Sequence, residues 1–275
     1  MRRMPGAIAS ALLLLVLAGC AAGSVAGDRP ETGIALPEVG AGFDYQLGGA
    51  YPTPDGATVI ARDRTEAPAG AGYDICYVNG FQTQRGDSSA FARRHPELVV
   101  QVDGEPLADP GWPDELILDT STDAKRTALA EIVEPWITGC ADAGYAAVEI
   151  DNLDSFSRSD GKLSADDNLA LAAEYARIAH DVGLAIAQKN TAEYTTRLAE
   201  IGYDFAVTES CAEFDECADY AEAYDVVLDI EYVDELGADA FAEACADRPE
   251  GVSMILRDHD LRMPDEDGYM FRACT

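Results

Sequence analysis

The chain has 275 residues, of which 51 are acidic and 19 are lysine or arginine, so its formal net charge is −32. Hydrophobic residues make up 48% of it, which is too many for a disordered acidic tail and enough for the core of one large α/β domain. A charge this negative argues against nucleic acid and anionic membrane surfaces as partners. It leaves open solubility, a salty or acidic habitat, or a cationic ligand.

Residues 1–19 have the pattern of a signal peptide. Arg2 and Arg3 form a positive start, and residues 11–18 form an apolar core that is too short to cross a membrane. The four residues that end at Cys20, LAGC, resemble a bacterial lipobox, in which cleavage leaves a lipid-modified cysteine. The alternative is an ordinary secretory signal with an incidental cysteine.

Residues 20–41 are rich in Gly, Ala and Pro and show no periodicity, so they predict a flexible tether after the lipidated cysteine. We therefore expect an exported protein that is anchored to the extracellular face of the cell membrane. Its membrane contact would be made only through the lipid on Cys20.

Six further cysteines suit an oxidising compartment and indicate three disulfides. The six are Cys76, Cys140, Cys211, Cys217, Cys245 and Cys274. Cys211–Cys217 is a plausible local loop, Cys245–Cys274 would hold the C-terminal tail, and Cys76–Cys140 remains by subtraction. A metal cluster is disfavoured because CxxC spacing and nearby histidines are missing, so we expect no metal and no cofactor.

Nine apolar runs predict β-strands from about residue 43 onward, and the later ones are typical of parallel strands buried on both faces. The runs are 43–48, 58–62, 74–79, 116–119, 147–152, 184–190, 205–209, 226–232 and 252–257.

Amphipathic stretches between these runs predict helices. Residues 124–138 place apolar side chains on one face and are followed by Gly139, and residues 165–182 begin with Ser164 and Asp167 in the spacing of a capping box. The alternation predicts a single (β/α)₈ TIM-like barrel over residues 42–275. An open doubly wound sheet is the alternative, but no GxGxxG follows an early strand.

Nine strand candidates compete for eight places in such a barrel. We expect that one early run, 43–48 or 58–62, lies outside it.

Five successive strand candidates end in polar residues or are followed by them. The polar residues at these ends are Asp151, Asn152, Asp154, Lys189, Asn190, Glu209, Glu231, Tyr232 and Asp258. The carboxyl ends of barrel strands meet at one mouth, so we expect these side chains to face one cleft. Loop-capping Asx residues, a buried ion pair of Lys189 or a solvated strand end would be the structural alternatives.

The residue inventory favours carboxylate chemistry. Serine hydrolysis is poorly supported because GxSxG is absent, zinc chemistry lacks histidines, and phosphate-binding loops are missing. Glycoside hydrolysis typically uses a pair of Asp or Glu carboxyl groups. Acids crowded together have separated pKa values, so one can hold a proton while the other stays ionised.

Residues 43–260 resemble glycoside hydrolase family 114, the endo-α-1,4-polygalactosaminidases, whose fold is TIM-barrel-like. The similarity rests on five runs: CYVNGFQTQ at 76–84, VEIDNLDSF at 148–156, QKN at 188–190, VTESCAEFDEC at 207–217 and IEY at 230–232. Ile150 stands where the family commonly has proline, and Thr208 and Ser210 replace its usual Asn and Gln.

The resemblance implies that Asp151 and Glu209 are the catalytic pair, and we expect Asp151 as nucleophile or base and Glu209 as general acid. It also implies that Asp154, Lys189, Asn190 and Tyr232 contact the substrate. The strand-end pattern adds Asn152, Glu231 and Asp258 as substrate contacts, and Tyr77 is an aromatic that could stack on a sugar.

The sequence therefore predicts a monomeric glycoside hydrolase that cleaves α-1,4-linked galactosamine-type polysaccharide. The free amines of this polymer are cationic and would be attracted to an acidic cleft. Two alternatives remain: a non-catalytic carbohydrate-binding lipoprotein on the same barrel, and a glycosidase for a different glycan.

Overall fold

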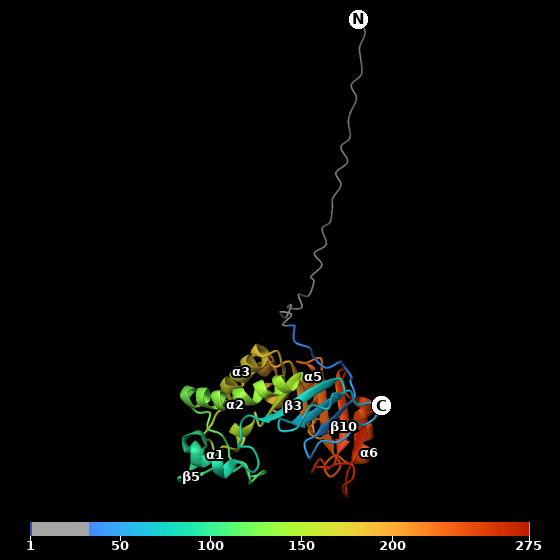
Figure 1. The fold of residues 1–275 in the computed structure, drawn as a ribbon. Coiled ribbons are helices and arrows are strands. Elements are labelled where there is room, and N and C mark those ends of the chain that lie inside the picture. The colour runs from blue at the N-terminus through green and yellow to red at the C-terminus, as the bar shows by residue number, and fades with distance from the viewer. Residues whose placement is uncertain (2–32, 275) are drawn as a thin grey trace. The chain divides into compact units, whose positions relative to one another are not determined.

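Parallel strands form a nearly closed, barrel-like sheet in the computed structural model, which describes Met1 and residues 33–274 (Figure 1). In spatial order the parallel strands are β1 (Phe43–Gln46), β2 (Val59–Asp63), β3 (Tyr73–Asn79), β6 (Ala147–Asp151), β7 (Ala185–Lys189), β8 (Phe205–Glu209), β9 (Val227–Tyr232) and β10 (Val252–Arg257). A ninth strand, β11 (Phe271–Ala273), pairs antiparallel with β10. The predicted TIM-like α/β fold is confirmed.

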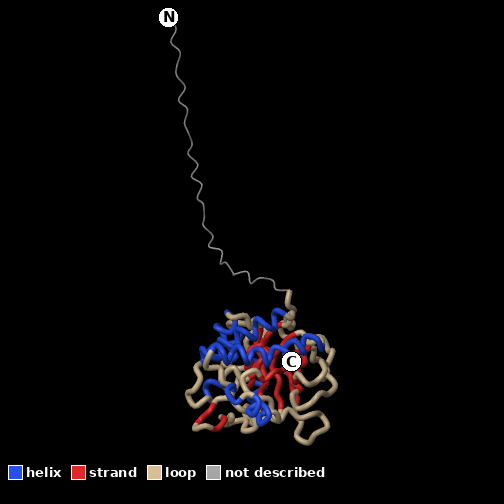
Figure 2. Tube along the Cα trace, turned by 60° about the vertical axis from the view of Figure 1, so that its left-hand side comes forward, coloured by secondary structure: helices blue, strands red, loops and turns tan. Residues whose placement is uncertain are grey.

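Helices lie outside the strands (Figure 2). They are α1 (Ser88–Arg94), α2 (Asp123–Ala143), α3 (Ala165–Asp181), α4 (Thr195–Glu200), α5 (Cys217–Ala221) and α6 (Ala238–Asp247), with 3₁₀ turns at Pro96–Leu98, Ser155–Arg158 and Ala192–Tyr194. A short hairpin of β4 (Gln101–Val102) and β5 (Glu105–Pro106) lies between β3 and α2.

Arg257 joins the two ends of the parallel sheet. β10 contacts β1, but no backbone ladder joins them among the described residues. The buried guanidinium of Arg257 instead donates to Asp44 Oδ1 at 3.0 Å and to the carbonyl oxygen of Tyr45. A side chain therefore closes the barrel where backbone pairing is missing.

Both early runs, 43–48 and 58–62, belong to the barrel, so the expectation that one lies outside was wrong. The run outside is 116–119, which makes single bridges to Gln82, Val99 and Ala108 in the segment between β3 and α2. An apolar run does not reveal its pairing partner, which is why the sequence did not separate these cases.

The connections from β1 to β2 and from β2 to β3 contain no helix. Residues 64–72 are fewer than the dozen that a crossover between parallel strands usually needs, and residues 47–58 only just reach it. Between β6 and β10 each connection contains a helix, and α3 begins with the predicted capping box of Ser164 and Asp167. Helix α2 continues through Gly139 and ends at Gly144, whose φ of 96° suits glycine.

Alternate residues of the strands separate two apolar cores. Tyr45, Ile75, Ala147 and Phe205 point into the barrel. Their neighbours, such as Val148, pack against the helices in a larger outer core. This period of two decides which polar side chains can reach the barrel interior.

The three disulfide pairings are confirmed: Cys76–Cys140, Cys211–Cys217 and Cys245–Cys274. The first ties α2 to β3, the second closes the loop after β8, and the third joins α6 to the segment after β11.

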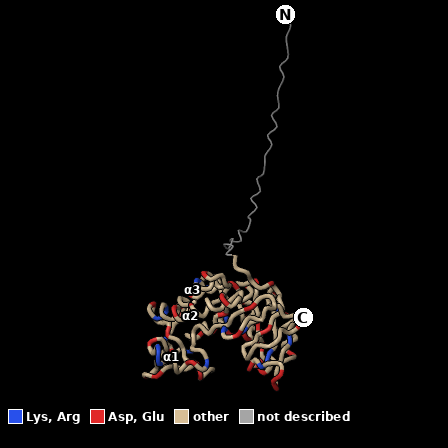
Figure 3. Tube along the Cα trace, in the orientation of Figure 1, with Lys and Arg blue, Asp and Glu red and all other residues tan. Residues whose placement is uncertain are grey.

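The predicted signal peptide, Cys20 and the tether as far as residue 32 lie outside the described residues. Residues 33–41 contain no helix or strand, but they lie against the barrel, where Pro37 is buried and the Tyr73 hydroxyl donates to the Ala35 carbonyl at 2.9 Å. Within the part of the chain that the structure describes, no helix has the length and apolarity to span a membrane. Acidic residues occur throughout this part (Figure 3).

Candidate active site

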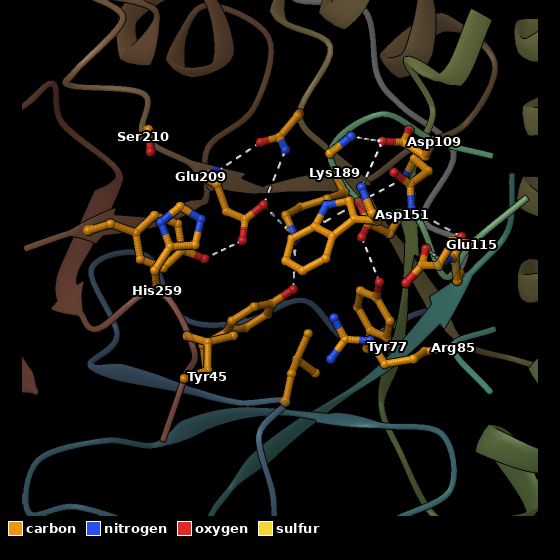
Figure 4. A pocket seen from close by; sticks show the side chains of 18 of the residues that line it. Tyr45, Tyr77, Arg85, Asp109, Glu115, Asp151, Lys189, Glu209, Ser210 and His259 are labelled. Atoms are coloured by element: carbon orange, nitrogen blue, oxygen red, sulfur yellow. Dashed lines mark hydrogen bonds and ion pairs between the residues drawn. The ribbon is translucent and has the colours of Figure 1, made fainter. Parts of the chain in front are cut away.

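A cleft of about 580 Å³ opens at the carboxyl ends of the strands. Asp151 ends β6, Lys189 ends β7 and Glu209 ends β8, and all three line the cleft with Tyr77 and Tyr232. In Figure 4, Lys189 lies between Glu209 on one side and Asp151 on the other. The structure thus brings together the two acids of the predicted pair.

Lys189 is the centre of the site. Its Nζ atom donates to the Tyr45 hydroxyl at 2.7 Å and to Glu149 Oε1 at 3.1 Å, and it lies 3.5 Å from Glu209 Oε2 and 4.0 Å from Asp151 Oδ1. Burial alone would lower the pKa of this 1%-exposed lysine, but the three carboxylates raise it well above its usual range. Lys189 therefore stays cationic and neutralises part of their charge.

Asp151 is held by two donors. The Tyr77 hydroxyl donates to Oδ2 at 2.6 Å, and the backbone N–H of Asn152 donates to Oδ1 at 2.7 Å. The side chain remains 18% exposed. A fixed carboxylate that still faces the cleft can act on a bound molecule.

Glu209 is held on the other side of Lys189. Its carboxylate accepts from the Tyr232 hydroxyl and from Asn190 Nδ2 at 3.5 Å, while its backbone N–H donates to Asn190 Oδ1 at 2.8 Å. Burial raises the pKa of Glu209, but Lys189 and the Tyr232 hydrogen bond outweigh it and lower the pKa below the usual range. The lowered pKa favours the ionised form of Glu209, and its role as general acid stays a prediction.

Glu149 is a member of the cluster that the sequence reasoning missed. It is fully buried, and its Oε1 accepts from Tyr45 at 2.6 Å as well as from Lys189. Burial raises its pKa, against the opposing effect of Lys189. Glu149 stands two residues before Asp151, so the alternation of β6 could have identified it as inward-facing.

Three functional strand ends are followed by a residue in the left-handed region. The φ angles are 65° for Asn152, 51° for Asn190 and 60° for Ser210. This conformation is uncommon for residues other than glycine, and asparagine adopts it more readily than serine. The chain therefore turns sharply directly after Asp151, Lys189 and Glu209, as strained backbone at functional sites does.

Asn152 and Asp154 line the cleft but are engaged by Arg158. The guanidinium of Arg158 donates to Asp154 Oδ2 at 2.5 Å, to Asn152 Oδ1 at 3.0 Å and to Asp109 Oδ2 at 2.5 Å. Both residues therefore lie at the cleft within a polar network, and their contact with a substrate stays a prediction.

Glu231 and Asp258 do not line the cleft, contrary to expectation. Glu231 precedes the inward-facing Tyr232 and lies on the opposite face of β9, where it accepts from the Ala212 N–H at 2.7 Å. Asp258 is buried and accepts from the N–H groups of Arg262 and Met270 at 3.0 and 3.1 Å. One is excluded by strand alternation and the other organises the loop after β10.

The rim contains further residues that were not singled out from the sequence, although Asn79 is the last residue of the run 74–79. Asn79, Asp109, Trp112 and Glu115 come from β3 and the long segment that follows it, and His259 stacks on Tyr232 with ring centroids 4.3 Å apart. Carboxylates outnumber lysine and arginine side chains in the cleft lining. The cleft therefore favours cationic ligands.

One group of described residues has metal-ligand spacing, namely Cys211, Cys217 and Asp229, whose ligand atoms lie within 4.8 Å of one another. The two cysteines form a disulfide, so their sulfurs are not the thiolates that bind a metal.

Comparison with known proteins gives a family match and structural neighbours. Residues 26–275 match the model of glycoside-hydrolase family GH114. The structure is similar to Ega3 of Aspergillus fumigatus in complex with galactosamine, with a TM-score of 0.68 and 22% identity over 86% of this chain and 96% of that one. It is also similar to the glycoside hydrolase domain of PelA from Pseudomonas aeruginosa, with a TM-score of 0.55 and 17% identity over 81% and 96%. No curated protein matches the chain.

Proposed function

The chain belongs to glycoside hydrolase family GH114, and we propose that it hydrolyses α-1,4-linked galactosamine-type polysaccharide with Asp151 and Glu209 as its catalytic carboxylates. The arrangement of these two acids around Lys189 in an open cleft is the observation that carries the proposal. Glycoside hydrolysis needs two carboxyl groups that flank the bond to be cut.

The site distinguishes the exposed acids from the buried one. Asp151 and Glu209 are 18% and 30% exposed, whereas Glu149 beneath them has no exposed surface. The first two can reach a sugar, and Glu149 can act only through Lys189 and Tyr45. Hydrogen bonds from Tyr77 and Tyr232 fix the exposed pair, and fixed groups need little reorganisation during reaction.

The substrate class is supported by charge and by similarity. The acidic lining attracts protonated amines, and the structurally similar Aspergillus fumigatus protein was solved with galactosamine. Arg158 is held by Asp109 and Asp154, and Lys189 is surrounded by acids, so neither would strongly repel an ammonium group.

The decisive experiment measures release of reducing ends from α-1,4-linked galactosamine polymers of graded acetylation. We expect the parent protein to cleave the deacetylated polymer, and the Asp151→Asn and Glu209→Gln proteins each to lose about 10³-fold in kcat. Asp181→Asn is the matched control, because that carboxylate is 65% exposed on α3 and pairs with Arg177.

Circular dichroism establishes that all variants are folded. Parent protein that binds the polymer but releases no reducing ends would instead be a carbohydrate-binding protein. Preferential cleavage of another glycan would show that the substrate differs from the proposed one, while the proposed role of the two carboxylates would stand. The anomer that is released, followed by proton NMR, distinguishes retention from inversion.

We also propose that the protein is a monomer, exported and anchored to the extracellular face of the membrane through Cys20. The support is the lipobox-like LAGC sequence and the tether that follows it. Metabolic labelling with a fatty acid should mark the parent protein and not the Cys20→Ser protein, which should appear in the medium. Light scattering of the soluble chain from residue 21 onward measures its oligomeric state.

A further inference from the structure

A rigid turn, residues 109–115, forms the wall of the cleft on the Asp151 side. Asp109 Oδ1 accepts the backbone N–H groups of Gly111 and Trp112 at 2.8 and 3.1 Å, and the Trp112 carbonyl accepts the Glu115 N–H at 2.8 Å. Asp109 Oδ2 accepts from Arg158 at 2.5 Å and from Gln82 at 2.6 Å. The turn therefore holds its side chains in place before any ligand arrives.

Trp112 projects from this turn into solvent at the cleft. Within residues 33–274 four large hydrophobic side chains are exposed, and two of them, Trp112 and Phe214, line the cleft. Exposing an indole forgoes the stabilisation that its burial would give. A flat aromatic face on a fixed turn is suited to stacking on the apolar face of a sugar.

Glu115, at the end of the same turn, lines the cleft beside the catalytic acids. Asn79 Nδ2 donates to its Oε2 at 2.7 Å, and Asn79 is the register partner of Asp151 across β3 and β6. Figure 4 shows Glu115 on the Asp151 side of the cluster. Burial raises the pKa of Glu115 to about 7, with Asp151 adding to the effect of burial.

Arg85 shows that a cation already occupies this wall. Its guanidinium lies over the Trp112 ring at 5.4 Å from the centroid, and it acts electrostatically on Glu115. The side chain is exposed, and among the described residues it makes no hydrogen bond or ion pair. Its position marks a place where positive charge is favourable and from which a loosely held side chain can be displaced.

We propose that Trp112 and Glu115 form a subsite for one cationic amino-sugar unit of the polymer, next to the bond that is cut. The sugar ring stacks on the indole, its ammonium group pairs with Glu115, and Arg85 is displaced. This inference rests on the proposed substrate class and adds the residues that would distinguish a free amine from an acetylated one.

The test is calorimetric binding of an α-1,4-linked galactosamine hexamer to the Glu209→Gln protein, in which turnover is suppressed. Adding Glu115→Gln or Trp112→Ala should weaken binding about 10-fold, the effect of one lost charge-assisted contact or one lost stacking contact. Adding Arg85→Ala should tighten binding about 3-fold, because the competing internal cation is removed.

Two matched controls come from the opposite wall. Glu235→Gln removes another cleft carboxylate, which accepts from Ser210 Oγ at 2.8 Å, and Phe214→Ala removes the other exposed aromatic of the cleft. We expect Glu115→Gln to exceed Glu235→Gln in effect on the hexamer and to have no effect on its fully N-acetylated counterpart. Affinity should also rise as the pH increases toward about 7, and this rise should vanish in the Glu115→Gln protein.

Unchanged binding by both the Glu115→Gln and Trp112→Ala proteins, weaker binding by Arg85→Ala, or equal losses from Glu115→Gln and Glu235→Gln would each overturn the subsite. So would failure of the Glu209→Gln protein to bind the hexamer. If the parent cleaves the polymer while Glu115→Gln changes nothing, the subsite fails and the proposed function stands. If binding depends on Glu115 but no reducing ends appear, hydrolysis fails and the subsite stands.

Discussion

Two groups of acids lie on neighbouring strands, and their charge is moderated in different ways: by a lysine in one group and by raised pKa values in the other. Inside the barrel, Glu149, Asp151 and Glu209 surround Lys189. On the outer face of β9, the carboxylates of Asp229 and Glu231 lie beneath the loop that begins at Ser210. No lysine, arginine or histidine among the described residues lies within 4.0 Å of this second pair.

Both acids of the outer pair have raised pKa values, which favours their protonated forms. Burial, followed by the adjacent Glu231, raises the pKa of Asp229 well above its usual range, and burial also raises the pKa of Glu231. Asp229 Oδ1 accepts from Thr208 Oγ1 at 2.7 Å and from the Cys211 N–H at 3.1 Å. Together with the Ala212 N–H on Glu231, these bonds hold the start of the loop.

The comparison shows that the charge state of these carboxylates depends on whether a lysine lies among them. The buried Lys189 lowers the pKa of Glu209, whereas burial without a nearby cation raises the pKa values of Asp229 and Glu231, whose carboxylates accept the backbone N–H groups of the loop. Acidic residues of the same kind therefore line the cleft on one face of the sheet and anchor a loop on the other.

Lys189→Met should have the largest effect, because it leaves three carboxylates without their cation. We expect the free energy of unfolding to fall by about 3–5 kcal/mol, the usual result of breaking a buried ion pair. Hydrolysis should be lost as well. Urea unfolding followed by circular dichroism measures the change, and a fall of less than about 1 kcal/mol would show that Lys189 does not hold the cluster together.

Asp229→Asn should change how stability depends on pH. The raised pKa of Asp229 means that the folded state binds more protons than the unfolded state, so the parent loses stability as the pH rises above the unfolded pKa of about 3.9. Asparagine mimics the neutral acid and removes this loss. Urea unfolding at several pH values measures the effect. Over this rise in pH, we expect the free energy of unfolding to fall by at least about 1 kcal/mol less in the variant than in the parent.

The same Asp229→Asn protein should keep hydrolytic activity within about 3-fold of the parent, because the acid anchors a loop and does not touch the cleft. Parallel curves of unfolding free energy against pH for variant and parent would contradict the raised pKa of Asp229 in the folded protein.

Tyr232→Phe should have a smaller effect than Lys189→Met. The Tyr232 hydroxyl helps to lower the pKa of Glu209, so its removal should raise that pKa and move the corresponding limb of the pH–rate profile to higher pH. We expect a fall in kcat/KM of about 10-fold, equivalent to one hydrogen bond to a charged group. Tyr73→Phe is the control, because its hydroxyl donates to the Ala35 carbonyl outside the cleft. An unmoved limb would show that Lys189 alone sets the charge of Glu209.

The sequence contained much of the central cluster. Asp151, Lys189 and Glu209 stand at the ends of apolar runs, and parallel strands bring such ends together. The even cysteine count and the short Cys211–Cys217 spacing likewise led to three correct pairings.

Other residues of the site could not be predicted from the sequence because their position depends on contacts between distant parts of the chain. Tyr45 lies in the first strand and meets Glu149 and Lys189 only when the barrel closes, which Arg257 and Asp44 accomplish from opposite ends of the domain. Trp112 belongs to the long segment between β3 and α2, whose hydrophobic residues show no helical or strand periodicity. Nothing in the local sequence therefore indicated that it lines the cleft.

The sequence by itself determined most of the strands and their polar ends, because strand periodicity and residue type are local properties. Its resemblance to glycoside hydrolase family 114 supplied the catalytic candidates Asp151 and Glu209. Only the tertiary structure decided that Glu231 and Asp258 turn away from the cleft and that Glu149 and Glu115 belong to it. Charge state was decided there too, since a carboxylate is ionised or protonated according to burial and the nearest cation, and both follow from how distant strands pack.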